Sequence, residues 1–401
     1  MKLAHLIGAA LGITISVTAA GTFGAKAADG VSIFAMGFNN PRGLKFGPDG
    51  YLYVAEAGLG GTRSTIGQCP QVPTPPGPYT GGRTARISKV APSGQRTTIA
   101  DGLPSAGTGP GGNNNDEGVS DIAFIGYEMY ALIAGGGCSH GNPDFPAGVI
   151  QVNRRDGTWR LVANLSAFFE AHPVAHPNPP DFEPDGTLFS MIAVHRKLYA
   201  IEPNQGRLLE INPENGNVRQ LLDFSASEGH IVPTAIVFDG IFRVGNLNTF
   251  PVVPGAAKIL DITKRGRIID EMSGLTAITG LALDSDDRLF VLELSTTPGA
   301  PAPGTGKIVL ARDTGEIEEI LTGLTFPAGN MAFRRDDALY VSNFSNLGTP
   351  GGGQILRVEV GGFEDDGSDP RRSLSTRLAR PCLGLACFQS LMHGMTGAIP
   401  R

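Results

Sequence analysis

The sequence lacks the short motifs that mark the most familiar catalytic sites. It contains no Gly-x-Ser-x-Gly nucleophile elbow, no Walker phosphate loop, no Cys-x-x-Cys pair and no dinucleotide fingerprint. These absences remove the usual support for nucleophile-elbow, nucleotide-dependent and thiol-redox chemistry. Function must therefore be argued from architecture rather than from a motif.

Strong charge of one sign is also missing. The chain has 32 Lys and Arg against 38 Asp and Glu, for a net charge of −6, and no basic stripe interrupts it. A nucleic-acid-binding surface needs clustered positive charge to neutralise phosphates. Nucleic acid is therefore not an expected partner.

Long apolar runs are confined to the amino terminus. Lys2 precedes an apolar stretch that begins at Leu3 and ends near Ala20, and small residues suited to cleavage follow it. The stretch is short and interrupted by glycine, which favours an export signal over a retained membrane anchor. We interpret residues 1–27 as a signal peptide. The mature protein is then expected to be secreted or periplasmic, with no membrane attachment.

Glycine and proline are abundant, with 56 and 30 residues, and they fit a protein of many turns. One phrase recurs six times: an apolar pair one residue apart, a tight polar turn, and a second apolar run. The last four copies begin 44, 45 and 50 residues apart, which is a spacing typical of propeller blades. The apolar pairs are Leu44/Phe46, Ile122/Phe124, Ile192/Val194, Ile236/Phe238, Leu281/Leu283 and Met331/Phe333.

Each copy is typical of four antiparallel strands. In the first copy, residues 44–46 alternate, Gly47-Pro48-Asp49-Gly50 supplies a turn, and residues 51–54 form an apolar run with two tyrosines and a β-branched valine. A third strand follows in every copy, and a second turn leads to a fourth strand in all but the last. The sequence therefore predicts an all-β, six-bladed β-propeller with four-stranded antiparallel blades.

The ends of the repeat array indicate how the ring closes. The sixth copy runs into Gly361 and Gly362 without a fourth strand, whereas Val31 to Phe34 is a strand without a partner. We expect this amino-terminal strand to complete the last blade, which removes two exposed sheet edges. The propeller is then predicted over 31–360. Residues 361–401 show no blade pattern and are expected to be a disordered or loosely attached tail.

Four cysteines in an exported protein permit disulfides. Cys69 and Cys138 lie after the second strand of the first two blades, so equivalent loops of neighbouring blades are expected to bring them within reach of each other. Cys382 and Cys387 lie in the tail, where they either pair locally or stay unpaired.

The long connecting segments follow the second and fourth strands of the blades. In an antiparallel blade the connections after these two strands share one face, and the turns on the other face are only a few residues long. Because long loops on a rigid scaffold commonly carry binding residues, the long-loop face is the expected binding face.

Two sets of residues are expected to line the channel mouth on that face: those at the start of the inner strands and those at the end of the second strands. They predict a polar, net negative mouth that binds a cation or a hydroxyl-rich ligand. The alternative is that these side chains cap the backbone of loops. The candidates are Arg42, Glu56, Asp121, Glu202, Thr234, Asn246, Thr279, Glu293, Asn330 and Asn343.

Four histidines fall in the long loops. His172 and His176 have the spacing of a helical metal pair, but proline follows each of them and argues against a helix. For these two, and for His140 and His230, a satisfied surface role is preferred to a metal-binding one.

Several motifs resemble the ScyD/ScyE family of exported propellers. The resemblance spans residues 31–360 and implies a six-bladed propeller without a secure reaction; Asn246 stands where the family often has Glu. The motifs are Asn39-Asn40-Pro41-Arg42-Gly43-Leu44, Phe46-Gly47-Pro48-Asp49-Gly50, Leu52 to Gly58, Val232-Pro233-Thr234, Phe250-Pro251 with residues 254–257, and residues 321–327.

Two functions remain in view. The first is a cofactor-free, monomeric binding scaffold whose long-loop face takes a small molecule or an extracellular polymer or protein. The second is a metal-dependent lactonase or ester hydrolase that resembles gluconolactonase and strictosidine synthase, with one divalent cation such as calcium at the channel mouth. The inner-strand starts offer only Asp121 and Asn330 as metal ligands, so the scaffold is favoured.

Overall fold

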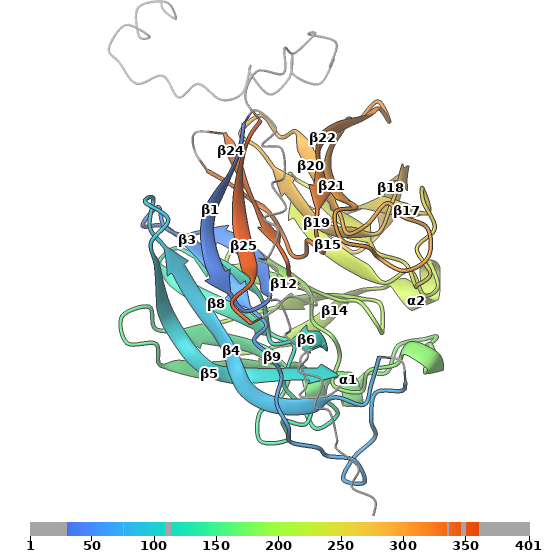
Figure 1. The fold of residues 1–401 in the computed structure, drawn as a ribbon. Coiled ribbons are helices and arrows are strands. Elements are labelled where there is room, and N and C mark those ends of the chain that lie inside the picture. Colours follow the sequence, from blue (N-terminus) through green and yellow to red (C-terminus); the bar gives the residue numbers. More distant parts are fainter. Residues whose placement is uncertain (1–29, 75, 109–113, 335–336, 346–349, 361–401) are drawn as a thin grey trace, which may run out of the picture. The chain divides into compact units, whose positions relative to one another are not determined.

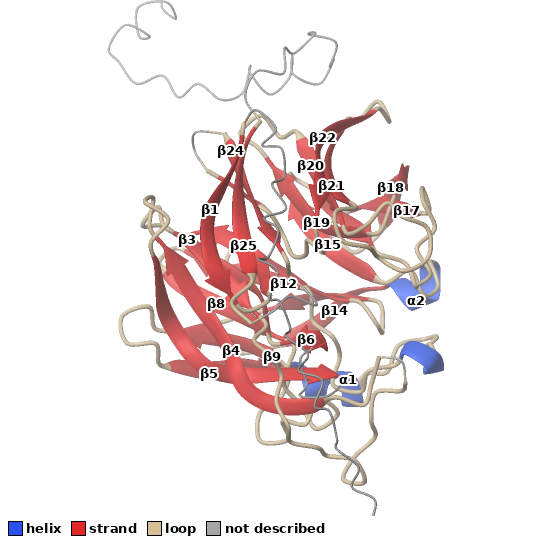
Figure 2. Ribbon diagram, in the orientation of Figure 1, coloured by secondary structure: helices blue, strands red, loops and turns tan. Residues whose placement is uncertain are grey.

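A computed structural model describes residues 30–360, except 75, 109–113, 335–336 and 346–349. The predicted signal peptide, the tail and its two cysteines lie outside the described residues. Within the described part of the chain, no helix is both long enough and apolar enough to cross a membrane. Strands make up nearly all of its regular secondary structure, and loops and a few short helices connect them (Figure 2).

Six antiparallel sheets form the blades of a six-bladed β-propeller (Figure 1). Blade 1 contains β2 (Pro41–Phe46), β3 (Leu52–Glu56), β4 (Thr80–Val90), β5 (Arg96–Thr108) and β6 (Asn114–Glu117). Blade 2 contains β7 (Val119–Ile125), β8 (Glu128–Ile133), β9 (Gly148–Val152) and β10 (Trp159–Asn164). Blade 3 contains β11 (Ser190–Val194), β12 (Lys197–Glu202), β13 (Arg207–Ile211) and β14 (Val218–Asp223). Blades 4 to 6 contain β15 (Pro233–Phe238), β16 (Phe242–Asn246), β17 (Ala257–Ile262) and β18 (Ile268–Leu275); β19 (Ile278–Leu283), β20 (Leu289–Glu293), β21 (Gly306–Ala311) and β22 (Ile317–Leu324); and β23 (Ala332–Phe333), β24 (Ala338–Asn343), β25 (Gly353–Glu359) and β1 (Val31–Phe38).

The ring closes through the two ends of the propeller. Strand β1 lies beside β25 as the outer strand of blade 6 (Figure 1), with Val31 opposite Val358 and Phe38 opposite Gly353. The inner strands β2, β7, β11, β15, β19 and β23 contact one another in that order, and β23 contacts β2. The predicted fold and its closure are thus confirmed.

Blade 1 differs from the four-stranded prediction because it has a fifth strand. Residues 102–118 are one of the long connecting segments that the sequence places after a fourth strand, and the segment is partly extended. Strand β5 continues to Thr108, and β6 pairs with it through Ala106 and Glu117. Strand β4 is 11 residues long, and its first residue, Thr80, lies opposite Gly107 of β5. The hairpin of β4 and β5 pairs the backbone N–H and C=O groups of this segment, which in an irregular loop would need other hydrogen-bond partners.

Short helices occupy parts of the long loops. Helix α1 (Leu165–Ala171) begins after Asn164, whose side chain accepts the N–H of Ala167. Helix α2 (Phe224–Ser227) follows β14, and the 3-10 helix η1 (Pro179–Asp181) lies between α1 and β11. His172 follows the end of α1 and His176 lies outside it, so no helical histidine pair forms.

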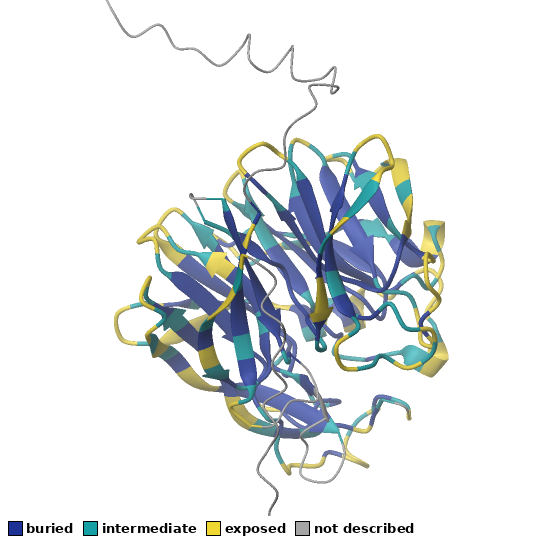
Figure 3. Ribbon diagram, turned by 45° about the horizontal axis from the view of Figure 1, so that its top comes forward, coloured by how far each residue is buried: buried dark blue, intermediate teal, exposed yellow. Residues whose placement is uncertain are grey.

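The core lies between neighbouring blades, where the strands are buried and the turns at the rims are exposed (Figure 3). Tyr340 of blade 6 shows the pattern: its ring meets Phe34 at 4.9 Å and Phe46 at 5.2 Å, both edge to face. One partner comes from its own blade and the other from blade 1. Aromatic pairs of this geometry add to the burial energy and here seal the junction of the ring.

Candidate functional site

The long loops contact one another across blade boundaries. A disulfide joins Cys69 of the β3–β4 loop to Cys138 of the β8–β9 loop, with a Cα–Cα distance of 6.3 Å, and this is the pairing that the sequence predicts. In blades 4 and 5, Val252 and Gly299 pair as an isolated bridge between the equivalent loops. The connections after the second strands therefore share one face, as the strand order requires.

The polar residues at the ends of the second strands anchor the loop that enters their own blade. Asn246 does so as a donor, from Nδ2 to the carbonyl of Ile231 at 2.8 Å. The other four accept a backbone N–H. These pairs are Glu56 with Asn39 (2.7 Å), Glu202 with Thr187 (3.1 Å), Glu293 with Thr276 (2.8 Å) and Asn343 with Thr325 (2.8 Å).

The three carboxylates of this set have further partners of their own. Arg86 pairs with Glu56 at 2.8 Å, and Lys307 lies 3.5 Å from Glu293. Glu202 accepts two more N–H groups, from Asn204 at 3.1 Å and Gln205 at 2.8 Å. The three do not converge on one point, so their observed role is to fix loops.

The residues at the starts of the inner strands link neighbouring blades. Thr234 donates to the carbonyl of Ile278 at 2.6 Å, and Thr279 donates to that of Pro327 at 3.1 Å. Both side chains are buried. Their hydrogen bonds hold blade 4 to blade 5, and blade 5 to the loop that enters blade 6.

Asp121 and Asn330 meet at the narrow neck of the channel. Asn330 donates from Nδ2 to Asp121 Oδ2 at 3.1 Å, and Met191 N–H donates to the same oxygen at 2.9 Å. A Cβ atom on Gly43 would lie 2.1 Å from Asp121 Oδ1, so only glycine allows blade 1 to approach this closely. Burial raises the pKa of Asp121 to about 7, against the lowering effect of these hydrogen bonds.

Arg42 alone among the predicted residues belongs to a cluster that the loops build. Its Nη2 donates to the carbonyl of Asp116 at 2.5 Å. The buried Asp116 side chain accepts from Asn40 through Oδ2, while its Oδ1 has no hydrogen-bond partner among the described residues. We call the six residues Arg42, Tyr79, Asp116, Glu117, His140 and Glu183 the loop-face cluster.

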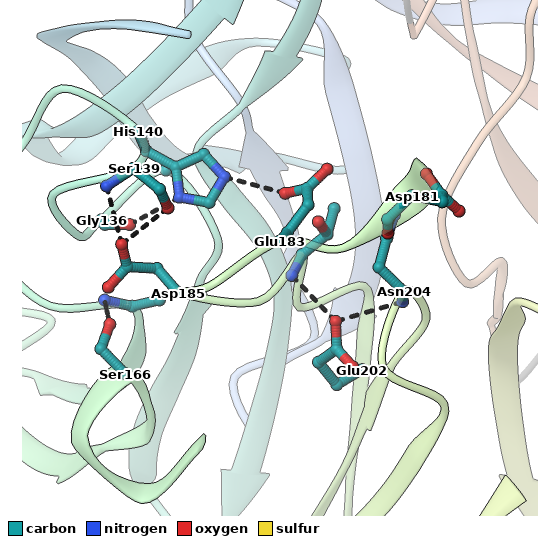
Figure 4. A network of polar contacts seen from close by, with 12 residues as sticks. Gly136, Ser139, His140, Ser166, Asp181, Glu183, Asp185, Glu202 and Asn204 are labelled. Carbon is teal, nitrogen blue, oxygen red and sulfur yellow. Dashed lines mark hydrogen bonds and ion pairs between the residues drawn. The ribbon is translucent and has the colours of Figure 1, made fainter. Parts of the chain in front are cut away.

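His140 and Glu183 form the part of the loop-face cluster that lies next to blade 2, and Figure 4 shows the contact between them. Its Nδ1 lies 2.9 Å from the carbonyl of Gly136 and its Nε2 lies 3.0 Å from Glu183 Oε2, and both side chains are buried. Asp185, two residues beyond Glu183, accepts from the N–H and hydroxyl of Ser139 at 2.8 and 2.7 Å. The expectation that His140 is a surface histidine is wrong, because the β8–β9 loop and the β10–β11 connection bury its ring.

Electrostatics set the protonation of this cluster. Burial alone lowers the pKa of His140, but the hydrogen bond and charge of Glu183 outweigh it and raise the pKa to about 9. Burial raises the pKa of Asp116 and of Glu117 to about 7, although the charge of Arg42 acts in the opposite direction. The cluster thus holds an imidazolium paired with Glu183 and two carboxyl groups that titrate near neutrality.

Sequence reasoning missed most of this cluster. Asp116 and Glu117 fall in a Gly- and Asn-rich segment, and Glu183 falls in a Pro-rich one, so all three resemble ordinary loop residues. The adjacent acidic pair, which only Gly118 separates from the inner strand β7, was the one available indication. Convergence of loops from three blades is a tertiary property that the spacing does not reveal.

The channel also contains a cavity of about 580 Å³ on the side of the short turns. It extends from Asp121 and Asn330 at the neck to the hairpin turns, where Lys45 and His195 are exposed. The predicted mouth residues other than Asp121 and Asn330 do not line it. The concave part of the channel therefore lies opposite to the face that the sequence favours.

Comparison with known proteins supports the fold and leaves the family open. No protein-family model and no curated protein matches the sequence. A protein of unknown function from Bacteroides thetaiotaomicron is similar in structure, with a TM-score of 0.51, 10% identity, and coverage of 82% of this chain and 75% of the other.

Two further structures show the same likeness. A putative oxidoreductase (glucose dehydrogenase) from Thermus thermophilus has a TM-score of 0.50 at 15% identity, covering 82% of this chain and 99% of the other. An auxiliary nutrient binding protein from Bacteroides thetaiotaomicron has a TM-score of 0.50 at 9% identity, covering 82% and 75%. At such identities the similarity concerns the fold alone.

Proposed function

We propose that the protein is an exported binding scaffold of the ScyD/ScyE type, which takes a hydroxyl-rich or cationic ligand at its long-loop face. The observation that carries this proposal is the loop-face cluster. Loops from three blades bring its charged groups together, and the buried Asp116 Oδ1 has no hydrogen-bond partner among the described residues. An unpaired buried acceptor is costly, and a ligand donor would satisfy it.

The chemistry of the cluster suits donors and cations. Asp116 and Glu117 accept hydrogen bonds from hydroxyl or ammonium groups when ionised. A cationic ligand would lower the pKa of both carboxyls from about 7, because its positive charge stabilises the ionised form that burial disfavours. Binding of such a ligand at pH 7 is therefore expected to release protons.

Calorimetric titration of the mature protein with spermidine and with cellohexaose tests the proposal. We expect saturable binding of at least one of them, weakened about tenfold in Glu117→Gln, since a hydrogen bond to a charged group contributes about 1.5–3 kcal/mol. Glu170→Gln, a change at an exposed residue of α1, is the matched control and should bind as the parent does. Absence of binding by both probes, or an unchanged Glu117→Gln, would contradict the proposal.

A metal-dependent lactonase or ester hydrolase is the second candidate, because Asp121 and Asn330 do meet at the axis. The residues present do not fit a divalent cation there. Both carboxylate oxygens of Asp121 accept hydrogen bonds from N–H groups, and Asn330 turns its Nδ2 toward the carboxylate while its Oδ1 accepts from Leu281 N–H at 3.4 Å. Within the described residues no group of three His, Cys, Asp or Glu side chains is arranged to hold a metal.

Hydrolysis of simple lactones and aryl esters, with and without added calcium, tests this second candidate. We expect no calcium-dependent turnover. Turnover that calcium restores and that Asp121→Asn abolishes would reverse the order of the two proposals.

A further inference from the structure

The channel cavity has the size and the lining of a small-molecule site that is distinct from the loop-face cluster. Its volume of about 580 Å³ lies within the range of roughly 300–1,000 Å³ that is usual for such sites. Aromatic side chains from several inner strands form part of its wall, among them Phe46, Phe238 and Phe333. These residues are partly exposed, so the wall offers apolar surface that a ligand can cover.

The floor of the cavity is a buried carboxyl group. Asp121 is 1% exposed and accepts three hydrogen bonds: Oδ1 takes one from Ile122 N–H at 2.8 Å, and Oδ2 takes one each from Met191 and Asn330. A carboxylate has about four acceptor positions, and three are used. Because Asp121 lines the cavity, a ligand that reaches the floor can supply one more donor.

Asp121 is the one acidic side chain among the described residues that line the cavity, so a cation is attracted to the floor. Lys45 is the cation that acts on Asp121, and its side chain is exposed where it lines the cavity. Solvent screens a charge in that position, whereas the low dielectric of the buried floor strengthens an interaction made there. His195, the other titratable group that lines the cavity, is also exposed.

We propose that this cavity binds a small molecule with a flat apolar body and a protonated amine, the amine donating to Asp121 and the body packing between the aromatic walls. Each inner strand is an edge strand of its sheet, so backbone groups along its second edge can add directional contacts where they are not already bonded at the neck. Entry is from the face of the short turns. A ligand at the loop-face cluster approaches from the opposite face, so the two sites are independent.

Three naphthalene probes that differ only in their polar group test the proposal on the full mature chain. They are 1-naphthylmethylamine, 1-naphthalenemethanol and 1-naphthoate, each titrated at pH 7 with naphthalene fluorescence as the readout. We expect the amine to bind most tightly, the alcohol less tightly and the carboxylate least, with at least about tenfold between the amine and the carboxylate.

Two substitutions separate the floor from the wall. Asp121→Asn should weaken the amine about tenfold and leave the alcohol unchanged, whereas Ala193→Phe, on the partly exposed wall, should weaken both by filling the cavity. If Asp121→Asn does not fold, the order of the probes and Ala193→Phe decide the matter. An amine that binds no more tightly than naphthoate, or an Ala193→Phe protein that binds the amine as the parent does, would overturn the proposal. Glu170→Gln serves as the control with parental binding.

Discussion

Asn330 donates from Nδ2 to Oδ2 of Asp121 at 3.1 Å, although 209 positions separate the two residues in the chain. The same pair accepts the N–H groups of Met191 in blade 3 and Leu281 in blade 5, and Asn330 reaches the carbonyl of Ile236 in blade 4 at 3.5 Å. Two side chains at the axis thus connect blades 2 to 6. The neck of the channel is a hydrogen-bonded junction as well as a floor.

Removing the amide at the neck should destabilise the whole ring. Asn330→Ala leaves buried donors and acceptors in several blades without a partner, at a cost of about 1–3 kcal/mol in the free energy of unfolding. Denaturant unfolding measures it. The exposed Asn217→Ala should change the stability little, and an equal loss in both variants would contradict the junction role.

Glu202 should be worth more to stability than a surface glutamate. Its carboxylate accepts three backbone N–H groups, and Glu202→Ala leaves all of them buried without an acceptor. We expect a loss of at least about 2 kcal/mol in thermal or denaturant unfolding. Glu170→Ala is the exposed control, and similar stability of the two variants would show that the loop does not depend on this anchor.

The His140–Glu183 pair predicts a fall in stability at alkaline pH. Because the folded-state pKa of His140 is raised to about 9 from 6.5, its contribution is complete below about pH 6.5 and is lost as the pH rises through 9. Unfolding free energies measured from pH 7 to 9.5 should decline for the parent protein. His140→Gln should decline less over this window, and the exposed His172→Gln should follow the parent.

Removing the charge of Asp116 should stabilise the protein, whereas removing that of His140 should not. Its folded-state pKa of about 7 exceeds 3.8, so ionisation opposes folding increasingly as the pH rises from about 4 to 7. Asp116→Asn should therefore stabilise the protein by about 1–3 kcal/mol at pH 8 and by less at pH 5. Asp101→Asn, at an exposed residue, is the control. A destabilised Asp116→Asn at pH 8 would show that the carboxylate has a compensating partner.

The turn between the last two strands of blade 2 should not tolerate a side chain. Gly157 has φ +74°, and a Cβ there would lie 2.3 Å from the carbonyl oxygen of Ile99 in blade 1. Gly315 has φ +86° in the equivalent turn of blade 5, with no atom within 4 Å. Gly315→Ala should cost about 1 kcal/mol for the backbone conformation, and Gly157→Ala about 1–3 kcal/mol more for the displaced blade. Equal losses in thermal unfolding would contradict this packing.

Much of the fold was predictable because each blade is encoded locally. Alternating apolar residues and turn-forming Gly, Asp and Pro specify hairpins such as β2–β3 without reference to distant parts of the chain. The closing strand was predictable from an unpaired Val31–Phe34 and a last repeat that lacks its outer strand. The fifth strand of blade 1 was not predictable, because the glycine-rich sequence of residues 102–118 carries no strand pattern. Strand β6 forms there by pairing with the extended end of β5, which itself pairs with β4.

The candidate site divides in the same way. The sequence by itself determined that Glu56, Glu202 and Asn343 stand at strand ends on the long-loop face, since strand count and polarity fix those positions. Only the tertiary structure decided what they do there. The same carboxylate or amide side chain can anchor a loop N–H or contact a ligand, so residue type and position do not distinguish the two roles. The loop-face cluster and the Asp121–Asn330 neck arise where separate blades approach one another, and no local pattern records which residues meet at the axis.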